Sequence, residues 1–337
     1  MRPLRVVFLL VGLVLLAFVV ARVDLTEVGD RLVQMGAVGV AVVLGVYFLV
    51  FLSDTASWHL MVTSTRLNGS WLYRLWKVRM VGEAFNAIVP AATMGGEPVK
   101  ALLLKRRHGI GYRESGASLV MARTTNLLAL IVFSAVGLVL MLRSGTLPGA
   151  YGVVAGAGLA ALTVGVAAFF AVQRWRIASR LAQWLARRRA GGRIERMLVH
   201  IQDVDGRFVD FYHRRPGRFA AALALALVNW VLGTLELYYA MYFLGGPVSF
   251  AEAWMVETVI QLVRAGTFFI PVSLGASEVG FVIMIGAITG RPGLGLAAAV
   301  ARRVRELVWI AWGLALGWGL SATPRVAAAE ASNPLER

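Results

Sequence analysis

The sequence contains no cysteine, and its four histidines stand far apart, at His59, His108, His200 and His213. The missing cysteines exclude disulfide bonds and thiolate metal sites. The isolated histidines show none of the spacings that metal sites use, so no metal or other cofactor is expected. Charged residues are also scarce, at 15% of the 337 residues, whereas 58% are hydrophobic and the mean hydropathy is +0.71. This composition excludes a water-soluble globule.

Long apolar runs recur along the chain and predict membrane-spanning helices, each of which needs about 20 apolar residues. We expect an all-α polytopic integral membrane protein with about six to eight transmembrane helices, built as a single membrane domain over residues 1–337. The first run is interpreted as an anchor helix and not as a signal peptide, because Val19–Arg22 is a poor cleavage site. The six runs are Val6–Ala21, Gly36–Trp58, Gly116–Leu142, Tyr151–Val172, Phe219–Leu244 and Leu296–Leu320.

The segment Val89–Arg107, VPAATMGGEPVKALLLKRR, does not read as a plain spanning helix. An apolar approach ends at Pro90, a small turn with two glycines follows, and Pro98 then stands where a helix would begin. The new helix reaches a basic end after too few residues to cross a bilayer. We therefore expect Val81–Lys105 to form a re-entrant hairpin, which is tolerated where protein or a water-filled cavity surrounds it. The basic, aromatic segment Arg66–Arg79 before it is expected at the membrane interface.

The same pattern returns in the second half of the chain. A proline, six residues and a glutamate, with glycine between them, occur in the first hairpin and again 181 residues later. We infer an internal duplication, with repeat 1 at about 36–142, repeat 2 at about 219–320 and a second re-entrant hairpin over Glu252–Gly290. The matched pairs are Pro90 and Pro271, Glu97 and Glu278, Arg123 and Arg303, Asn126 and Glu306, and Asp54 and Glu236, at offsets of 180 to 182.

The distribution of lysine and arginine predicts the orientation. If the N-terminus is cytoplasmic and each hairpin returns to its own side, 25 basic residues lie inside and 4 outside, as the positive-inside rule requires. Twelve of them lie in residues 173–218, which we interpret as a basic cytoplasmic loop. Both termini are then cytoplasmic, and the hairpins enter from opposite sides, so the repeats have inverted topology. Hairpin arms that cross fully would raise the number of spans to as many as ten without changing this orientation. Because topology explains the basic excess, no nucleic-acid partner is expected.

Charged residues within the spans are costly if unpaired, so they indicate either ion pairs that pin the helices or a polar cavity. Both interpretations stay open. In a cavity, arginine would hold phosphate through its two-pronged fork, and helix starts would add free N–H groups. Lys100, on the same helix face as Glu97, would either hold phosphate or neutralise that carboxylate. The expected substrate-binding residues are Gly95, Gly96, Glu97, Lys100, Arg123, Glu278 and Arg303, and the expected coupling or counter-charge residues are Asp54, Glu236, Arg264 and Glu306.

Three segments, GGEPVKALLLKR, ARTTNLLAL and IPVSLGASEVGFV, resemble the flippase-like membrane domain of lysylphosphatidylglycerol synthases, and the resemblance covers nearly the whole chain. The second hairpin departs from the family pattern, which usually has Pro-Gly-Gly near Pro271, where this chain has Val272–Gly275. The resemblance implies a stand-alone member that translocates a lipid or handles a lipid-linked substrate. Aminoacylation of lipid is not implied, because no aminoacyl-transferring domain is recognised.

Two classes of function follow from these observations. The favoured one is a flippase-like lipid transporter of the cytoplasmic membrane that accepts an anionic or lipid-linked headgroup between the hairpins, without catalysing a reaction. The alternative is a membrane enzyme, or an accessory subunit, that acts on lipid phosphates in lipid or cell-envelope biosynthesis. An enzyme would need a compact cluster of nucleophile, base or metal ligands, and none is visible in the sequence. The expected ligand is a membrane phospholipid or isoprenoid lipid. A second copy of the chain or a lipid-synthesis enzyme is the protein partner to test.

Overall fold

The computed structural model describes residues 25–88, 95–145, 148–174, 215–267, 270 and 273–322. Within these ranges the chain forms nine α-helices and no strand. The expected anchor helix, both hairpin prolines, most of the basic loop and the C-terminal tail lie outside the described residues. The helices are α2 (Leu25–Met61), α3 (Gly69–Ile88), α4 (Glu97–His108), α5 (Tyr112–Ser144), α6 (Gly149–Arg174), α9 (Pro216–Phe243), α10 (Phe250–Gly266), α11 (Ala276–Thr289) and α12 (Pro292–Ala322).

The long helices coincide with the predicted spans that fall within the described residues. Helices α2, α5, α6 and α9 are long and apolar enough to cross a membrane. Helix α12 has 31 residues, which gives a length of about 46 Å at about 1.5 Å per residue, more than the roughly 30 Å of a hydrocarbon core. Its mean hydropathy is lowered by a group of arginines and a glutamate near its middle. The expected all-α polytopic membrane fold is thus confirmed.

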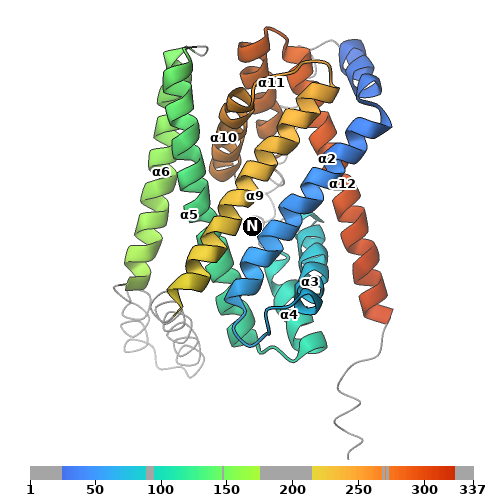
Figure 1. Ribbon diagram of the computed structural model, residues 1–337, viewed down its shortest axis with the longest axis vertical. Coiled ribbons are helices and arrows are strands. Elements are labelled where there is room, and N and C mark those ends of the chain that lie inside the picture. The colour runs from blue at the N-terminus through green and yellow to red at the C-terminus, as the bar shows by residue number, and fades with distance from the viewer. Residues whose placement is uncertain are drawn as a thin grey trace, which may run out of the picture.

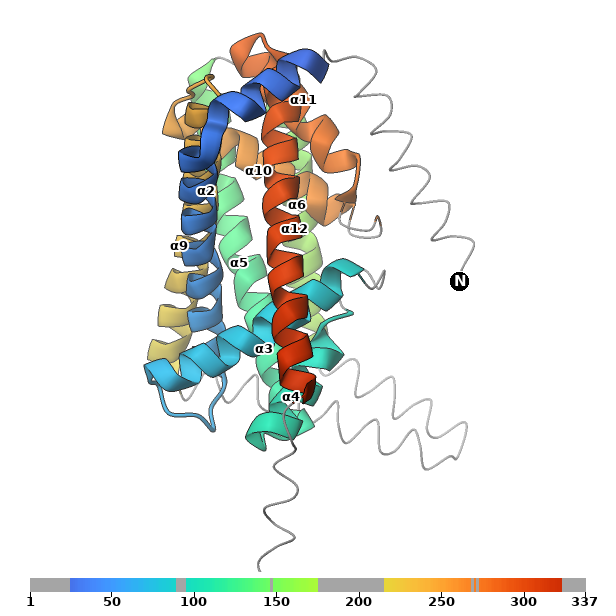
Figure 2. The same ribbon diagram turned by 90° about the vertical axis from the view of Figure 1, so that its right-hand side faces the viewer.

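Helix α2 begins earlier than the predicted span, which starts at Gly36. The eleven residues before Gly36 are also helical. The chain bends at Gly36, whose φ of 59° and ψ of −179° are open to glycine and to hardly any other residue. The segment before the bend lies across one end of the bundle (Figure 2). Arg31 donates to the carbonyls of Leu244 (3.3 Å) and Gly245 (3.2 Å) and so ties this segment to the end of α9.

Two short helical hairpins, α3–α4 and α10–α11, lie in opposite halves of the bundle (Figure 1). The second view also shows them in opposite halves of the bundle (Figure 2). Helices α4, α10 and α11 have 12, 17 and 14 residues, fewer than the roughly 20 that a spanning helix needs. The two hairpins therefore enter the bundle from opposite ends, which is the placement that an inverted arrangement requires.

The first arm of the first hairpin is longer than predicted. The sequence suggests an interfacial segment over Arg66–Arg79, but α3 runs as one helix from Gly69 and includes most of it. Leu75 and Val78 on this helix are 0% and 2% exposed and pack in one cluster with Leu104 of α4. Burial of these apolar side chains fixes this helix against α4, and the interfacial position of the segment stays a prediction.

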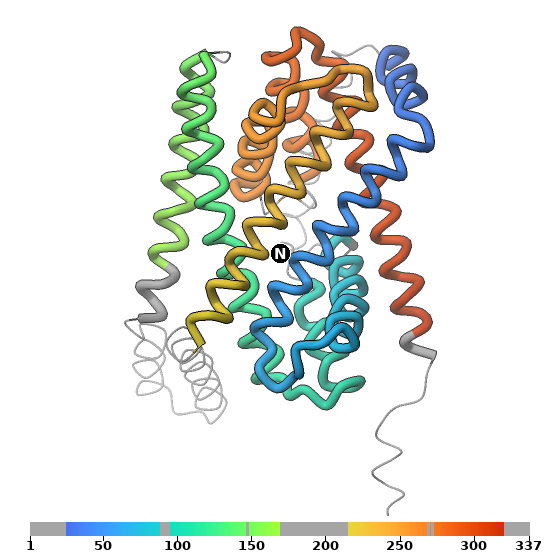
Figure 3. Tube along the Cα trace, in the orientation of Figure 1, coloured from blue at the N-terminus to red at the C-terminus, as the bar shows by residue number. Residues whose placement is uncertain are grey.

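The contacts between helices in one half of the chain recur between the corresponding helices of the other half. Helices α2 and α9 lie side by side at the centre of the bundle (Figure 3). Helix α3 packs on α12 as α10 packs on α5, and α4 packs on α5 as α11 packs on α12. Helix α6 packs on α5 and α10 and has no counterpart among the described helices. This arrangement agrees with an internal duplication, which stays a prediction from the sequence, as do the repeat boundaries.

Candidate functional site

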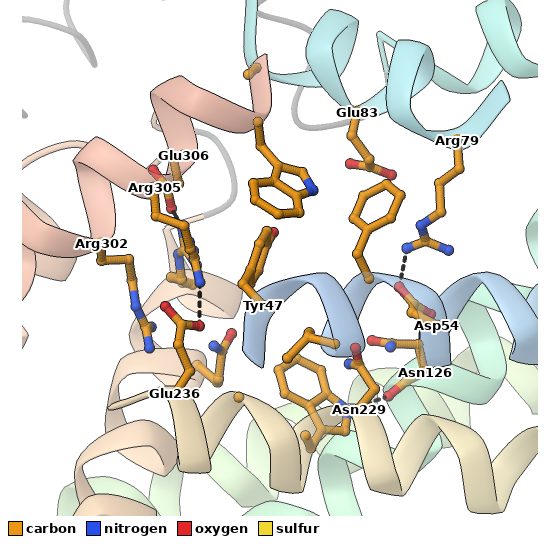
Figure 4. Close-up of a pocket in the computed structure, with 18 of the residues that line it drawn as sticks. Tyr47, Asp54, Arg79, Glu83, Asn126, Asn229, Glu236, Arg302, Arg305 and Glu306 are labelled. Carbon is orange, nitrogen blue, oxygen red and sulfur yellow. Dashed lines mark hydrogen bonds and ion pairs between the residues drawn. The ribbon is translucent and has the colours of Figure 1, made fainter. Parts of the chain in front are cut away.

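A polar cavity of about 290 Å³ lies where α2, α3, α5, α9, α10 and α12 converge (Figure 4). A smaller cavity of about 80 Å³ adjoins it beside the first hairpin and shares Asp54, Arg79, Glu83 and Asn126 with it. The charged residues of the larger wall are Asp54, Arg79, Glu83, Glu236, Glu257, Arg264, Arg302, Arg305 and Glu306, and the smaller wall adds Glu97, Lys100 and Arg123.

Lys100 forms salt bridges with two carboxylates of its own hairpin. Its Nζ lies 2.7 Å from Glu83 Oε1 and 3.0 Å from Glu97 Oε1, and the residue is 4% exposed. Asn86 donates a further hydrogen bond to Glu83 (3.1 Å). The lysine stem passes over Gly82, where a Cβ would collide with Lys100 Cγ and Cε. Of the two roles that the sequence leaves open for Lys100, the geometry supports neutralisation of Glu97.

Gly96 has a packing role that the sequence does not reveal. A Cβ on this residue would overlap the backbone carbonyl of Gly82, so α3 and the start of α4 touch backbone to backbone. The Gly96 N–H donates to Asn86 Oδ1 at 2.6 Å, which occupies one of the helix-start N–H groups expected to meet an anion. Gly95 lies in the same turn, and neither glycine lines the cavities. These two expected binding residues therefore shape the hairpin turn.

Glu278 and Arg303 pair with each other at the second hairpin, with Arg303 Nε 2.6 Å from Glu278 Oε1. Arg303 Nη1 also lies 2.7 Å from Glu306 Oε2, and Arg264 Nη2 lies 2.7 Å from Glu306 Oε1. Ser277 Oγ donates to Glu278 (2.9 Å) and accepts from Arg303 (3.1 Å). Arg264 and Glu306 line the larger cavity, whereas Glu278 and Arg303 line neither cavity. One connected cluster thus joins α10, α11 and α12.

Three further ion pairs join helices across the wall of the larger cavity. Arg302 donates twice to Glu257, from Nη1 to Oε1 (3.2 Å) and from Nη2 to Oε2 (2.7 Å). Gln261 donates to the same carboxylate (2.5 Å). This pair connects α12 to α10 and is almost fully buried, with side chains 9% and 3% exposed. The other two pairs are Arg305 with Glu236, from α12 to α9, and Arg79 with Asp54, from α3 to α2 (Figure 4).

Arg123 differs from the other cations of the two walls. It lies on α5, is exposed, and lines the smaller cavity together with Glu97 and Lys100. Every other lysine or arginine of the walls has a carboxylate within ion-pair distance, whereas Arg123 has none among the described residues. Among the described residues, Arg123 is therefore a cation of a membrane-spanning helix that lines a polar cavity without a carboxylate beside it.

Among the described residues, the charges of the two walls sum to zero, because six carboxylates stand against six cations. Within the described ranges, no three histidines or carboxylates converge in a way that could hold a metal ion. Buried N–H donors without a hydrogen-bond partner include Nε of Arg79, Nε of Arg305 and Nε1 of Trp309, and all three residues belong to the larger wall. An unmade hydrogen bond of this kind costs about 1–3 kcal/mol, so the larger wall holds donors that the described protein atoms do not satisfy.

Five charged wall residues are absent from the site that the sequence predicts. They are Arg79, Glu83, Glu257, Arg302 and Arg305. The usable signal is helical spacing, because Arg302, Arg305 and Glu306 fall on one face of an otherwise apolar segment. Arg79 and Glu83 are likewise four residues apart on α3.

Comparison with known proteins agrees with this architecture. The model of the family described as "Lysylphosphatidylglycerol synthase TM region" matches residues 5–313. The chain is 22% identical over 347 residues to a protein named "UPF0104 membrane protein" from Methanothermobacter thermautotrophicus, with 94% of each chain covered. No solved structure matches the chain. Because the family model spans nearly the whole sequence, the chain is a multi-pass membrane protein that belongs to the lysylphosphatidylglycerol synthase transmembrane-region family.

Proposed function

We propose that this protein moves a phosphate-bearing lipid headgroup across the cytoplasmic membrane while the hydrocarbon tails stay in the bilayer. The headgroup enters the polar cavities between the hairpins and leaves chemically unchanged. The observation that carries the proposal is Arg123, a guanidinium on a cavity wall that has no carboxylate partner among the described residues. Ionisable side chains at membrane depth are retained chiefly where they serve a ligand path or a relay.

Phosphate is the group that Arg123 is best suited to bind. Its guanidinium presents parallel N–H groups that match two phosphate oxygens. Asn126, three residues further along α5, lies at the junction of the two cavities. Its amide group can hydrogen-bond a headgroup that passes from the smaller cavity into the larger one.

An apolar groove supports a lipid as the ligand. It has a volume of about 570 Å³ and lies between α6, α10 and α11, with Val259 and Leu262 among its lining residues. Ala276, also on its wall, directly precedes Ser277, which accepts a hydrogen bond from Arg303 in the charged cluster. A hydrocarbon chain in the groove would hold its lipid beside the polar part of the second hairpin.

The family and the charge distribution support the remaining parts of the proposal. The name of the family refers to a phospholipid, which is the class of ligand proposed. Basic residues crowd the end of the bundle that holds the outer parts of α3 and α4, so we assign this end to the cytoplasm. If the anchor helix that the sequence predicts before α2 crosses the membrane once, both termini are cytoplasmic. The basic residues at this end are Arg66, Arg74, Lys77, Lys105, Arg106, Arg107 and Arg113.

The proposal is tested with purified protein in phosphatidylcholine vesicles that carry a fluorescent phosphatidylglycerol, and then a panel of other phospholipids and isoprenoid phosphates. The readout is the fraction of label that a membrane-impermeant quencher reaches over time. Arg123→Gln should slow translocation roughly 10- to 100-fold, because a hydrogen bond to a charged group contributes about 1.5–3 kcal/mol. Arg123→Lys should fall between this variant and the wild type.

The matched control is Arg106→Gln, which removes an exposed arginine of the same basic end that lines neither cavity. Translocation at the wild-type rate by Arg123→Gln, with every lipid of the panel that the wild type moves, would contradict the proposal. Mass spectrometry of the lipids afterwards separates transport from chemistry. Unaltered lipid is expected, and a modified lipid would favour the alternative of a membrane enzyme.

A further inference from the structure

The two halves of the molecule treat equivalent residues differently. Glu97 and Glu278 are matched by an offset of 181 residues, and Arg123 and Arg303 by an offset of 180. In the second half the matched glutamate and arginine form an ion pair, with Arg303 Nε 2.6 Å from Glu278 Oε1. In the first half the matched pair is not formed, although Glu97 and Arg123 line the same cavity of about 80 Å³.

The two halves also differ in the residue three positions after each glutamate. In the first half it is Lys100, whose Nζ lies 3.0 Å from Glu97. In the second half the same offset leads to Phe281, which is 1% exposed and cannot compete for a carboxylate. Glu278 therefore pairs with its arginine, whereas Glu97 pairs with the lysine of its own helix. The second half serves as an internal control for the first.

The position of Lys100 is closely fixed. The residue is 4% exposed, and its stem fills the space beside Gly82, where any Cβ would collide with it. Its ammonium bridges Glu83 and Glu97, so the lysine holds both carboxylates of the hairpin on the α3–α4 side of the cavity.

We propose that Lys100 is a positioning residue whose task is to hold Glu97 and thereby keep Arg123 free for the phosphate of the ligand. The proposal rests on the function proposed above. A carboxylate left without a cation in a low-dielectric environment is costly. Two arginines line the small cavity together with Glu97, and Arg79 is already paired with Asp54, which leaves Arg123. Without Lys100, Glu83 would keep its hydrogen bond from Asn86. Glu97 would then form an ion pair with Arg123, as Glu278 does with Arg303 in the second half.

Formation of the ion pair between Glu97 and Arg123 can be measured without any ligand. Glu97→Gln, Arg123→Gln and their combination are compared by thermal unfolding in detergent, first with Lys100 present and then in a Lys100→Met background. With Lys100 present, the shifts in Tm of the two single variants should add, because the two side chains are not paired. In the Lys100→Met background they should not add, and the double variant should be less destabilised than the sum. Glu278→Gln with Arg303→Gln is the positive reference, and its shifts should not add.

Additive shifts in both backgrounds, or non-additive shifts with Lys100 present, would overturn the proposal. If Lys100→Met does not insert, Lys100→Gln keeps a polar end and replaces it, and the comparison of the two halves with Lys100 present still decides between pairing and no pairing. Lys100→Arg keeps the charge and should retain the additive pattern.

Translocation of the fluorescent lipid provides the second readout. Lys100→Met should lose translocation to the level of Arg123→Gln, and Lys100→Met combined with Glu97→Gln should regain most of it, because no carboxylate is left to capture the arginine. A merely structural lysine would not be rescued by removing a second charge. The thermal measurement alone decides the ion-pair exchange, so a failure of the lipid assay in every variant and in the wild type would count against the proposed function and not against the role of Lys100.

Discussion

The buried pair of Arg302 and Glu257 should be a structural pin whose loss unfolds the bundle. Glu257→Gln removes the negative charge and one of the two oxygens that accept from Arg302 at 3.2 and 2.7 Å. The arginine side chain is only 9% exposed, so little water can reach it to replace the lost partner. Removing one member of such a pair costs about 3–5 kcal/mol, a large part of the roughly 5–15 kcal/mol that stabilises a folded domain.

The matched control is Glu97→Gln, which also removes one glutamate charge from the cavity walls. The Glu97 side chain is 32% exposed, and Lys100 keeps Glu83 at 2.7 Å when Glu97 is neutralised. This variant should lose only about 1 kcal/mol or less, as exposed pairs do. Replacing both members of the buried pair by leucine should recover most of the stability, because apolar pairs of similar volume replace buried ion pairs without loss or with a gain of about 1–4 kcal/mol.

The assay is thermal unfolding of each purified variant in one detergent, followed by the loss of the monodisperse peak in gel filtration. Glu257→Gln should unfold at a clearly lower temperature than both Glu97→Gln and the leucine double variant. Equal unfolding temperatures for the two glutamine variants would refute the reasoning, because burial and partner number would then not determine the cost of removing a charge.

Three other outcomes are expected. Glu97→Gln should insert, fold and keep most of the lipid translocation measured in vesicles, because Lys100 still holds Glu83 and Arg123 gains no carboxylate; a loss as large as that of Arg123→Gln would show that transport needs the Glu97 charge. In this cysteine-free chain, Arg106→Cys should react with an impermeant thiol reagent from the cytoplasm and Ala287→Cys from outside, and labelling of both from one side would contradict the inverted hairpins. Gly96→Ala should cost about 1–3 kcal/mol by overpacking against α3, whereas Gly116→Ala, which meets nothing within 4 Å, should be neutral or gain about 0.4–1 kcal/mol, as thermal unfolding would reveal.

The fold was largely predictable because the bilayer imposes lengths and hydropathies that appear directly in the sequence. The runs beginning at Gly36, Gly116, Tyr151, Phe219 and Leu296 all lie within long helices. The extent of α3 was not predictable, since Leu75 and Val78 are buried only after α4 folds back on them. A segment that carries four basic residues looks interfacial until its packing partner is known.

The members of the charged site were visible as unusual residues in apolar spans, but most of their partners were not. Glu97 and Lys100 share one helix face, so spacing predicts that contact. The partner of Glu257 stands 45 residues away on another helix, and its identity depends on how α10 and α12 pack. Spacing also cannot reveal that Arg123 lacks a partner, because this follows from the position of every carboxylate around it.

The zero sum of fixed charges on the cavity walls determines how the membrane voltage would act on transport. A neutral wall adds no charge of its own to a ligand, so the charge that crosses the electric field is that of the headgroup alone. Moving one elementary charge through 100 mV changes the free energy by about 2.3 kcal/mol. An anionic headgroup leaving an inside-negative cytoplasm would therefore be driven outward by the voltage without a coupled ion. A zwitterionic headgroup would not respond to the voltage and would follow its own concentration gradient.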